Sequence, residues 1–237
     1  MGKKAKRIQK PTTIFFLRHG QPENPRKLIK GTASFPLFEE GQEQVKVQAK
    51  KLKGERIAAI FTSPALRCRQ TAWIAASVLN EDLPGVKTPR KPCRWRGRVS
   101  GCSEAEAMTP PRWNISGPGG VKIKQTTHLS EWTSEYDGQP AAVMADFSLE
   151  EYNRAFQPKM TVLKRMKDFV RMALAKYPGQ RIVAVSHQGP IDLLLFSLQG
   201  KDTANLPREG LITKMGELIK VILSQDMKIL EIERISY

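Results

Sequence analysis

The sequence is poor in cysteine and has no long apolar run. Its 237 residues include three cysteines, and no two of them have CxxC spacing, which excludes a disulfide-stapled scaffold and a zinc ribbon. No stretch approaches the roughly 20 apolar residues that cross a bilayer. The basic N-terminus also lacks the apolar centre of a secretory signal. We therefore expect a cytoplasmic protein without a membrane span.

Acidic residues are scarce as well, because 23 Asp and Glu stand against 39 Lys and Arg, for a net charge of +16. The excess is concentrated in two segments: residues 1–10 carry five Lys or Arg, and residues 86–124 carry nine against two Glu. Such segments attract phosphate-rich partners through unspecific charge. No recognition-helix, zinc-finger or RNP pattern accompanies them, so the sequence does not predict nucleic-acid binding beyond that attraction.

The hydrophobic pattern predicts one α/β domain. Short apolar runs predict buried strands, and periodic apolar positions predict amphipathic helices. The expected strands are 12–17, 56–61, 181–186, 217–223 and 228–235, and the expected helical stretches are 39–53, 64–79, 148–176 and 190–198. Their alternation predicts a mostly parallel sheet between two helix layers, an αβα sandwich.

Two parts of the chain depart from this pattern. Residues 1–11 read as a basic tail, so the expected domain is 12–237. Residues 84–126 are rich in Pro, Gly, Arg and Trp without a clean period, and we interpret them as an irregular insertion. We expect residues 84–147 to form a lid over the domain.

Polar side chains follow three of the expected strands at the point where each strand ends. Arg18 and His19 follow the first strand, Ser63 to Arg67 follow the second, and His187 follows 181–186. Ligands of such sheets bind outside the carboxyl ends of the strands, so we expect these groups to share one crevice. Arginine pairs with phosphate oxygens through two parallel N–H groups, and a neutral imidazole can attack phosphorus. The sequence therefore predicts a phosphate site.

Three motifs in this order resemble the histidine phosphatase superfamily, which includes the phosphoglycerate mutases. They are Leu17-Arg18-His19-Gly20, the run Thr62-Ser63-Pro64-Ala65-Leu66-Arg67 with Gln70-Thr71-Ala72, and Val185-Ser186-His187. The resemblance covers about residues 12–80 and 127–198. It implies a phosphoglycerate mutase-like fold and a phosphatase that hydrolyses a small anionic phosphomonoester through a phosphohistidine, with no metal and no cofactor.

The resemblance also implies roles for individual residues. His19 would be the nucleophile, and the phosphoryl group would be bound by Arg18, Arg67, His187 and Asn24. Glu131 would be the general acid, because Leu129-Ser130-Glu131 precedes Tyr136-Asp137-Gly138 as in relatives. Glu104 and Glu135 are rival candidates for that role.

Two alternatives stay open at this point. The first is a phosphotransferase of the phosphoglycerate mutase type. The second is a phosphate-binding protein of the same fold that has lost turnover. Gln188 keeps the second alternative open, because relatives have Gly directly after the histidine that corresponds to His187.

Overall fold

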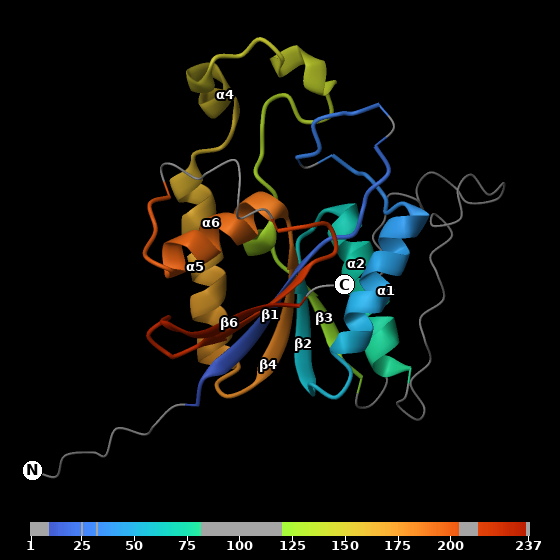
Figure 1. Ribbon diagram of the computed structural model, residues 1–237, viewed down its shortest axis with the longest axis vertical. Coiled ribbons are helices and arrows are strands. Elements are labelled where there is room, and N and C mark those ends of the chain that lie inside the picture. Colours follow the sequence, from blue (N-terminus) through green and yellow to red (C-terminus); the bar gives the residue numbers. More distant parts are fainter. Residues whose placement is uncertain (1–9, 25, 32, 82–119, 204–212, 236–237) are drawn as a thin grey trace, which may run out of the picture.

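A computed structural model describes residues 10–24, 26–31, 33–81, 120–203 and 213–235, which form one sheet with helices on both faces (Figure 1). The strands are β1 (Thr12–Arg18), β2 (Ile57–Thr62), β3 (Lys122–Gln125), β4 (Arg181–Ser186), β5 (Leu218–Leu223) and β6 (Ile229–Ile235). The helices are α1 (Glu39–Lys51), α2 (Leu66–Asn80), α4 (Leu149–Ala155), α5 (Lys159–Lys176) and α6 (Gln188–Leu198), with short 3₁₀ turns η2 (Thr127–Leu129) and η3 (Ala141–Met144).

The strands lie in the order β3-β2-β4-β1-β5-β6. β1 to β4 run parallel, while β5 and β6 complete the sheet in antiparallel fashion. In the parallel register Arg18 lies opposite Ser186, and Thr62 lies opposite Val185. The strands that precede the predicted polar groups thus end side by side. The expected αβα fold with a mostly parallel sheet is confirmed.

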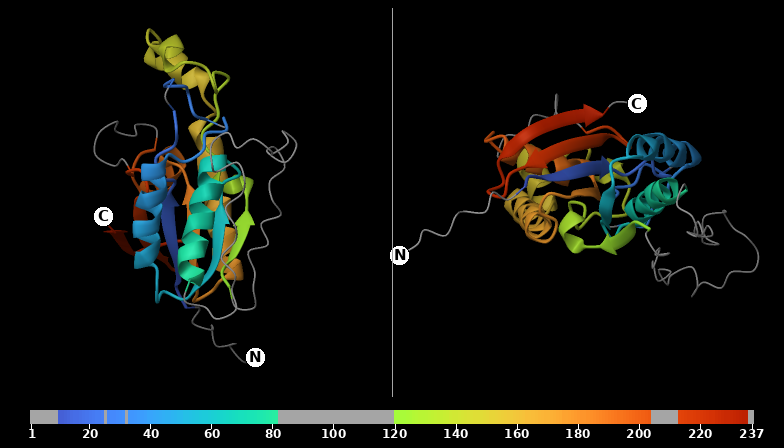
Figure 2. Two further views of the ribbon diagram at one scale, coloured as in Figure 1. Left: turned by 90° about the vertical axis from the view of Figure 1, so that its right-hand side faces the viewer. Right: turned by 90° about the horizontal axis from the view of Figure 1, so that it is seen from below.

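Alternation along β1 explains the three layers. Ile14 and Phe16 face the core under α5 and α6, whereas Phe15 and Leu17 face the core under α1 and α2. All four side chains are buried, as expected for a central strand that is covered on both faces. Figure 2 shows the two helix pairs on opposite sides of the sheet.

The helical stretch expected at 148–176 is two helices. α4 ends at Ala155 and Phe156 is extended. Pro158 then disfavours a helical conformation of the residue before it and is the N-cap of α5. None of the described helices is both long and apolar enough to cross a bilayer.

The strand β3 was not predicted, because its sequence Lys-Ile-Lys-Gln has a single apolar residue. It extends the sheet beside β2, with Ile60 paired to Ile123. The interpretation of 84–126 as wholly irregular is therefore wrong for its last residues. Most of that stretch (84–119, with Glu104) and residues 1–9 of the tail lie outside the described residues, so the limits of the lid stay a prediction.

Two irregular segments lie beyond the carboxyl ends of β1, β2 and β4. One is the loop 21–37, and the other runs from η2 to α4 and stands furthest from the sheet (Figures 1 and 2). A short β-bridge joins them between Leu28 and Pro140. The strand ends that carry the predicted site therefore face these two segments.

Candidate active site

Four of the side chains singled out in the sequence lie together where the parallel strands end. Arg18 is the last residue of β1 and His19 follows it, His187 follows β4, and Arg67 lies in the first turn of α2. Arg67 Nε is 3.2 Å from His19 Nε2, and Arg67 Nη2 is 3.2 Å from His187 Nδ1. The two imidazole rings are 5.2 Å apart, edge to face. All four residues are at least nine-tenths buried.

The hydrogen bonds of His19 determine its tautomer. Its Nδ1 is 2.9 Å from the carbonyl oxygen of Gly20, so this nitrogen carries the proton and donates. Nε2 then holds a lone pair, which accepts the N–H of Arg67. Burial and the neighbouring Arg67 charge hold the pKa of His19 well below its ordinary value. The ring is therefore neutral at physiological pH, with its nucleophilic nitrogen toward Arg67.

Arg67 is fixed by carbonyl groups of the loop 21–37. Its Nη2 donates to Gly31 at 2.7 Å and its Nη1 to Ala33 at 3.2 Å. The guanidinium is fully buried, and its plane is set before any ligand arrives. A pre-oriented arginine of this kind is an efficient partner for phosphate oxygens.

Arg18 is oriented by a chain of hydrogen bonds that leads through Thr213 to Asp192. Its Nη1 donates to the carbonyl of Thr213, and Thr213 in turn donates through its N–H and its hydroxyl to Asp192 on α6. Burial lowers the pKa of Arg18, and the carboxylates of Glu131 and Asp192 partly oppose that shift. Its Nε is buried and has no hydrogen-bond partner in the described parts of the chain. One buried donor is thus left for an anion.

His187 has a hydrogen-bond partner in Ser63, one of the polar residues that follow β2. Its Nε2 is 2.8 Å from Ser63 Oγ. Because Arg67 can only donate to Nδ1, the neutral ring carries its proton on Nε2 and donates to Ser63. The helix expected at 64–79 begins two residues later than predicted, since Ala65 is the N-cap and α2 begins at Leu66.

Cys68 lies beside the same ring but has no nucleophilic character. Its Sγ is 3.4 Å from His187 Nε2. Burial raises the pKa of its thiol to about 12, so the thiolate, which is the reactive form of cysteine, is not populated at neutral pH.

Glu131 lies at the open side of this cluster. One carboxyl oxygen is 3.3 Å from His187 Nδ1 and 3.8 Å from Arg67 Nη2, and the other accepts the backbone N–H of Trp132 at 2.9 Å. Its side chain is 19% exposed. Burial raises its pKa although Arg67 opposes the shift, which suits a group that must deliver a proton.

The remaining candidates lie differently. The side-chain amide of Asn24 donates to the carbonyl of Leu28 at 2.8 Å and accepts its N–H at 2.9 Å, so Asn24 closes the loop, and its contact with phosphate stays a prediction. Glu135 is exposed, and Glu104 lies outside the described residues. Gln188 is half-buried in the first turn of α6. Of the candidate acids in the described residues, Glu131 is the one beside the histidines.

The carboxylate and the two histidines are close enough to suggest a metal site. One ligand atom from each of His19, Glu131 and His187 lies within 4.8 Å of the others. The guanidinium of Arg67, however, lies within 4 Å of all three. A fixed cation among the ligand atoms repels a metal ion and attracts an anion. The donor set therefore fits a phosphoryl group better than a cation.

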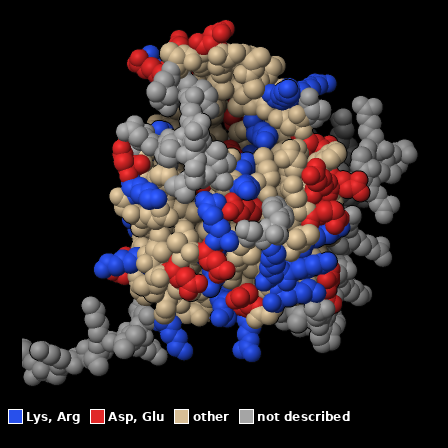
Figure 3. Space-filling view, in the orientation of Figure 1, with Lys and Arg blue, Asp and Glu red and all other residues tan. Residues whose placement is uncertain are grey.

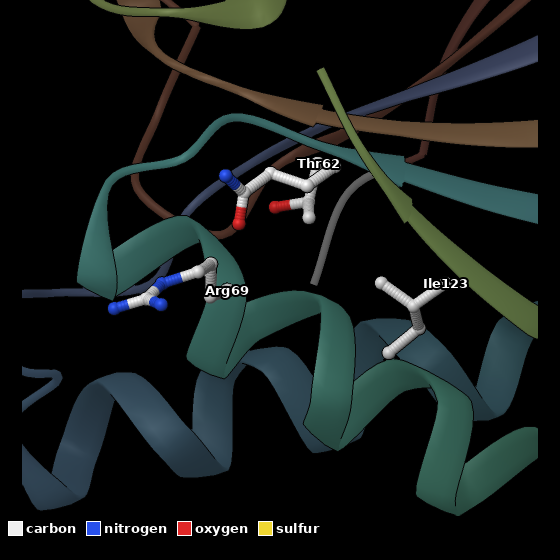
Figure 4. A pocket seen from close by; sticks show the side chains of 4 residues that line it. Thr62, Arg69 and Ile123 are labelled. Carbon is white, nitrogen blue, oxygen red and sulfur yellow. The ribbon is translucent and has the colours of Figure 1, made fainter. Parts of the chain in front are cut away.

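The surface is hollowed beneath the α4 segment, where Figure 3 shows basic and acidic atoms. A separate pocket of about 30 Å³ is lined by Thr62, Arg69, Ile123 and Gln125, between β2, β3 and α2 (Figure 4). Its volume matches one water molecule's share of the liquid, so it is too small for a phosphoester.

Comparison with known proteins identifies the family. The chain matches the histidine phosphatase superfamily (branch 1) over residues 14–101 and 115–231. It belongs to this superfamily. The histidine phosphatase fold is also that of a solved mycobacterial glucosyl-3-phosphoglycerate phosphatase, with a TM-score of 0.66, 16% identity and coverage of 96% of this chain and 99% of that one.

Curated relatives of this superfamily member are similar to it over part of their length. A probable phosphoglycerate mutase GpmB of Yersinia enterocolitica is 31% identical over 50% of this chain and 56% of its own. A probable phosphatase of Schizosaccharomyces pombe is 35% identical over 52% of this chain and 59% of its own. The chain thus spans somewhat more than half the length of both. One of these relatives is named a mutase and the other a phosphatase, which are both kinds of phosphoryl-transfer enzyme.

Proposed function

We propose that this histidine phosphatase superfamily member is a metal-independent phosphomonoesterase that acts on a small anionic phosphoester through a phosphohistidine at His19. The observation that carries the proposal is the unprotonated Nε2 of His19, which faces the buried guanidinium of Arg67 at 3.2 Å. Attack on a phosphoryl group requires a nucleophilic lone pair and, close to it, a fixed cation that binds the phosphoryl oxygens.

In the first step, His19 Nε2 attacks phosphorus and the ester P–O bond breaks. Arg18 and Arg67 bind the phosphoryl oxygens, and His187 completes the ring of contacts. Glu131 gives its proton to the leaving oxygen, so the alcohol departs neutral. The raised pKa of Glu131 supports this role, because its burial favours the protonated form that must deliver the proton.

In the second step, the Glu131 carboxylate takes a proton from water and the water oxygen attacks phosphorus. The P–N bond breaks, inorganic phosphate forms, and His19 returns to its neutral state. The depressed pKa of His19 supports this cycle, because a neutral imidazole is both the nucleophile of the first step and the leaving group of the second.

The test is hydrolysis of p-nitrophenyl phosphate in EDTA by the wild type, His19→Ala and His128→Ala. His128 is the matched control, since its ring contacts Thr126 and not the phosphate site. We expect activity in the wild type and the control, with loss in His19→Ala, and an acid-labile phosphoprotein in quenched wild type. Turnover by folded His19→Ala would overturn the mechanism.

A mutase is the second candidate, because one partial relative is named a probable phosphoglycerate mutase. The same preparation, primed with 2,3-bisphosphoglycerate, would then interconvert 2- and 3-phosphoglycerate faster than it releases phosphate. Release of phosphate without interconversion supports the phosphatase. Binding of phosphate without either reaction would support a binding protein that has lost turnover.

A further inference from the structure

The turn 213–217, which leads into β5, contacts the two residues at the end of β1. Arg18 donates through Nη1 to the carbonyl oxygen of Thr213. Its backbone N–H donates to the carbonyl oxygen of Glu217 at 3.0 Å, and a backbone N–H of the turn donates to the carbonyl oxygen of His19 at 3.1 Å. The turn therefore fixes one nitrogen of the Arg18 guanidinium and the backbone next to it.

Asp192 on α6 anchors the first residue of this turn. Its carboxylate oxygens are 3.2 and 3.3 Å from the backbone nitrogen of Thr213, which donates to them. The hydroxyl of Thr213 donates to the same carboxylate. Because Thr213 is fully buried, these donors would be left unsatisfied without the carboxylate, at a cost in free energy. Asp192 therefore keeps in place the carbonyl group that binds Arg18.

Glu217 anchors the other end of the turn. Its Oε2 accepts the backbone N–H of Lys214 at 2.6 Å, which closes the turn. Its Oε1 accepts a hydrogen bond from Arg234 on β6 at 2.7 Å, and the Glu217 side chain is only 10% exposed. Two largely buried carboxylates, from different elements of the fold, thus fix the two ends of the turn that contacts Arg18.

The side chain of Arg18 is oriented by these contacts before a ligand binds. Its Nε is buried and has no hydrogen-bond partner among the described residues. The guanidinium is planar, so a hydrogen bond at Nη1 together with a fixed backbone restricts the direction of the Nε–H. A donor that is already oriented loses less conformational entropy when it binds an anion.

We propose that Asp192 and Glu217 are positioning residues for phosphoryl binding, because they fix the turn 213–217 and through it direct the Nε–H of Arg18 at a phosphoryl oxygen. This inference rests on the proposed function for the identity of the ligand. It concerns binding rather than turnover, so the two can be tested separately.

Orientation and charge make opposite predictions for these carboxylates. Both add negative charge near Arg18, and negative charge by itself weakens the binding of an anion. If they acted through charge alone, their removal would tighten phosphate binding. If they position Arg18, their removal weakens it. The sign of the change in affinity therefore distinguishes the two roles.

The experiment measures binding of inorganic phosphate by calorimetry to the wild type, Asp192→Ala, Thr213→Val and Thr213→Ser. Asp226→Ala is the matched control. Asp226 also accepts a hydrogen bond from a hydroxyl, that of Ser224, but it lies in the turn between β5 and β6, at the end of β5 away from the site. Urea unfolding checks that each variant is folded.

We expect Asp192→Ala and Thr213→Val to raise the Kd for phosphate about tenfold, as for residues coupled in one hydrogen-bond network. Thr213→Ser keeps the hydroxyl and should bind as tightly as the wild type. Glu217→Gln, which loses the charge that pairs with Arg234, should have a smaller effect in the same direction. The control should not change the Kd.

Arg18→Lys tests whether Asp192 acts through Arg18, because lysine keeps the positive charge but has no Nε–H. Adding Asp192→Ala to Arg18→Lys should weaken phosphate binding by no more than about twofold further. A full tenfold loss in that background would overturn the proposal. Unchanged or tighter binding in Asp192→Ala and Thr213→Val would overturn it as well.

Failure of the proposed function looks different. A wild type that binds phosphate but hydrolyses no phosphoester would contradict the phosphatase, while the comparison of Kd values would still test Asp192. A wild type that binds no phosphate would overturn both. If Asp192→Ala does not fold, the pair Thr213→Val and Thr213→Ser decides, since a structural role alone would change the stability of these variants and not the Kd of the folded protein.

Discussion

The site has two halves that the fold builds in different ways. Arg18, His19, Arg67 and His187 sit at or just beyond the ends of adjacent parallel strands, and they are 0% to 8% exposed. Glu131 comes from an irregular segment beyond the sheet, and its side chain is partly exposed. We call these the sheet half and the loop half. In the proposed mechanism the sheet half binds the phosphoryl group, which every substrate shares, and the loop half serves the leaving group, which differs among substrates.

The difference teaches how one fold can keep a reaction and change its substrate. The positions of the sheet half follow from strand register, and moving one of these residues would require shifting a strand in the core. The loop half depends on a few contacts, such as the bridge between Leu28 and Pro140. Changes in the loops can therefore alter leaving-group recognition without disturbing phosphoryl binding.

The largest expected effect is that of Glu131→Gln in the loop half. A glutamine keeps the shape but has no proton to transfer, so hydrolysis of an alkyl phosphate should slow by about 10²–10⁴-fold. Hydrolysis of p-nitrophenyl phosphate should slow far less, because nitrophenolate leaves without a proton. Steady-state rates on both substrates check this.

Glu135→Gln is the control, as this exposed carboxylate lies in the same segment. It should leave both rates unchanged. If Glu131→Gln slowed both substrates equally, Glu131 would not be the general acid. The two halves would then not differ in function as described.

The second effect concerns Asp192, which supports the sheet half through Thr213. Partial burial raises the pKa of Asp192 above its ordinary 3.8, to about 6. Between pH 3.8 and about pH 6, Asp192 keeps its proton in the folded protein but has lost it in the unfolded chain. The contribution of Asp192 to stability is therefore full below pH 3.8 and is lost as the pH rises through 6. The loss is at most about 3 kcal/mol at 1.36 kcal/mol per pKa unit.

Asp192→Asn removes this titration. The free energy of unfolding, measured with urea between about pH 4 and pH 7, should rise in Asp192→Asn relative to wild type as the pH increases. Asp168→Asn is the contrast, because Lys164 and Arg171 lower the pKa of Asp168 and its removal should lower relative stability toward neutral pH. A pH-independent difference for Asp192→Asn would show that its carboxyl group does not titrate in this window.

The third prediction concerns Gly189, which lies close to Trp132 and to Glu131 of the loop half. A Cβ at Gly189 of α6 would be 2.8 Å from Trp132 Cε3 and 3.9 Å from Glu131 Oε1. Gly189→Ala should therefore lower the free energy of unfolding by about 1–3 kcal/mol through overpacking, or displace Trp132 and Glu131. Urea unfolding together with alkyl phosphate hydrolysis separates these outcomes. An increase in stability, as alanine gives at an open helical position, would show that Trp132 can retreat without cost.

The same division explains what the sequence could predict. β1, β2 and β4 are continuous apolar runs, so their ends, and with them Arg18, His19 and His187, could be placed from pattern alone. Glu131 could be named only through family resemblance.

The sequence placed Ser63 at the crevice but could not predict its contact with His187. Only the register of β2 against β4 brings the Ser63 hydroxyl to that ring. β3 was missed because it forms by pairing with β2 at the edge of the sheet, where little apolar surface is needed.

The smallest effect is expected for Ser63→Ala. Ser63 Oγ lies 2.8 Å from His187 Nε2, and without it the remaining neighbour of that nitrogen in the described residues is the weak acceptor Cys68 Sγ at 3.4 Å. Loss of one neutral hydrogen bond of about 1 kcal/mol frees the tautomer of His187 and should lower kcat/KM by about fivefold. Ser63→Thr keeps the hydroxyl and should restore the rate. Because His187 belongs to the sheet half, alkyl and nitrophenyl phosphates should slow by the same factor. A loss confined to alkyl phosphates would instead mean that Ser63 acts through Glu131, whose carboxyl oxygen lies 3.3 Å from the other nitrogen of that ring, and that the two halves are coupled through His187.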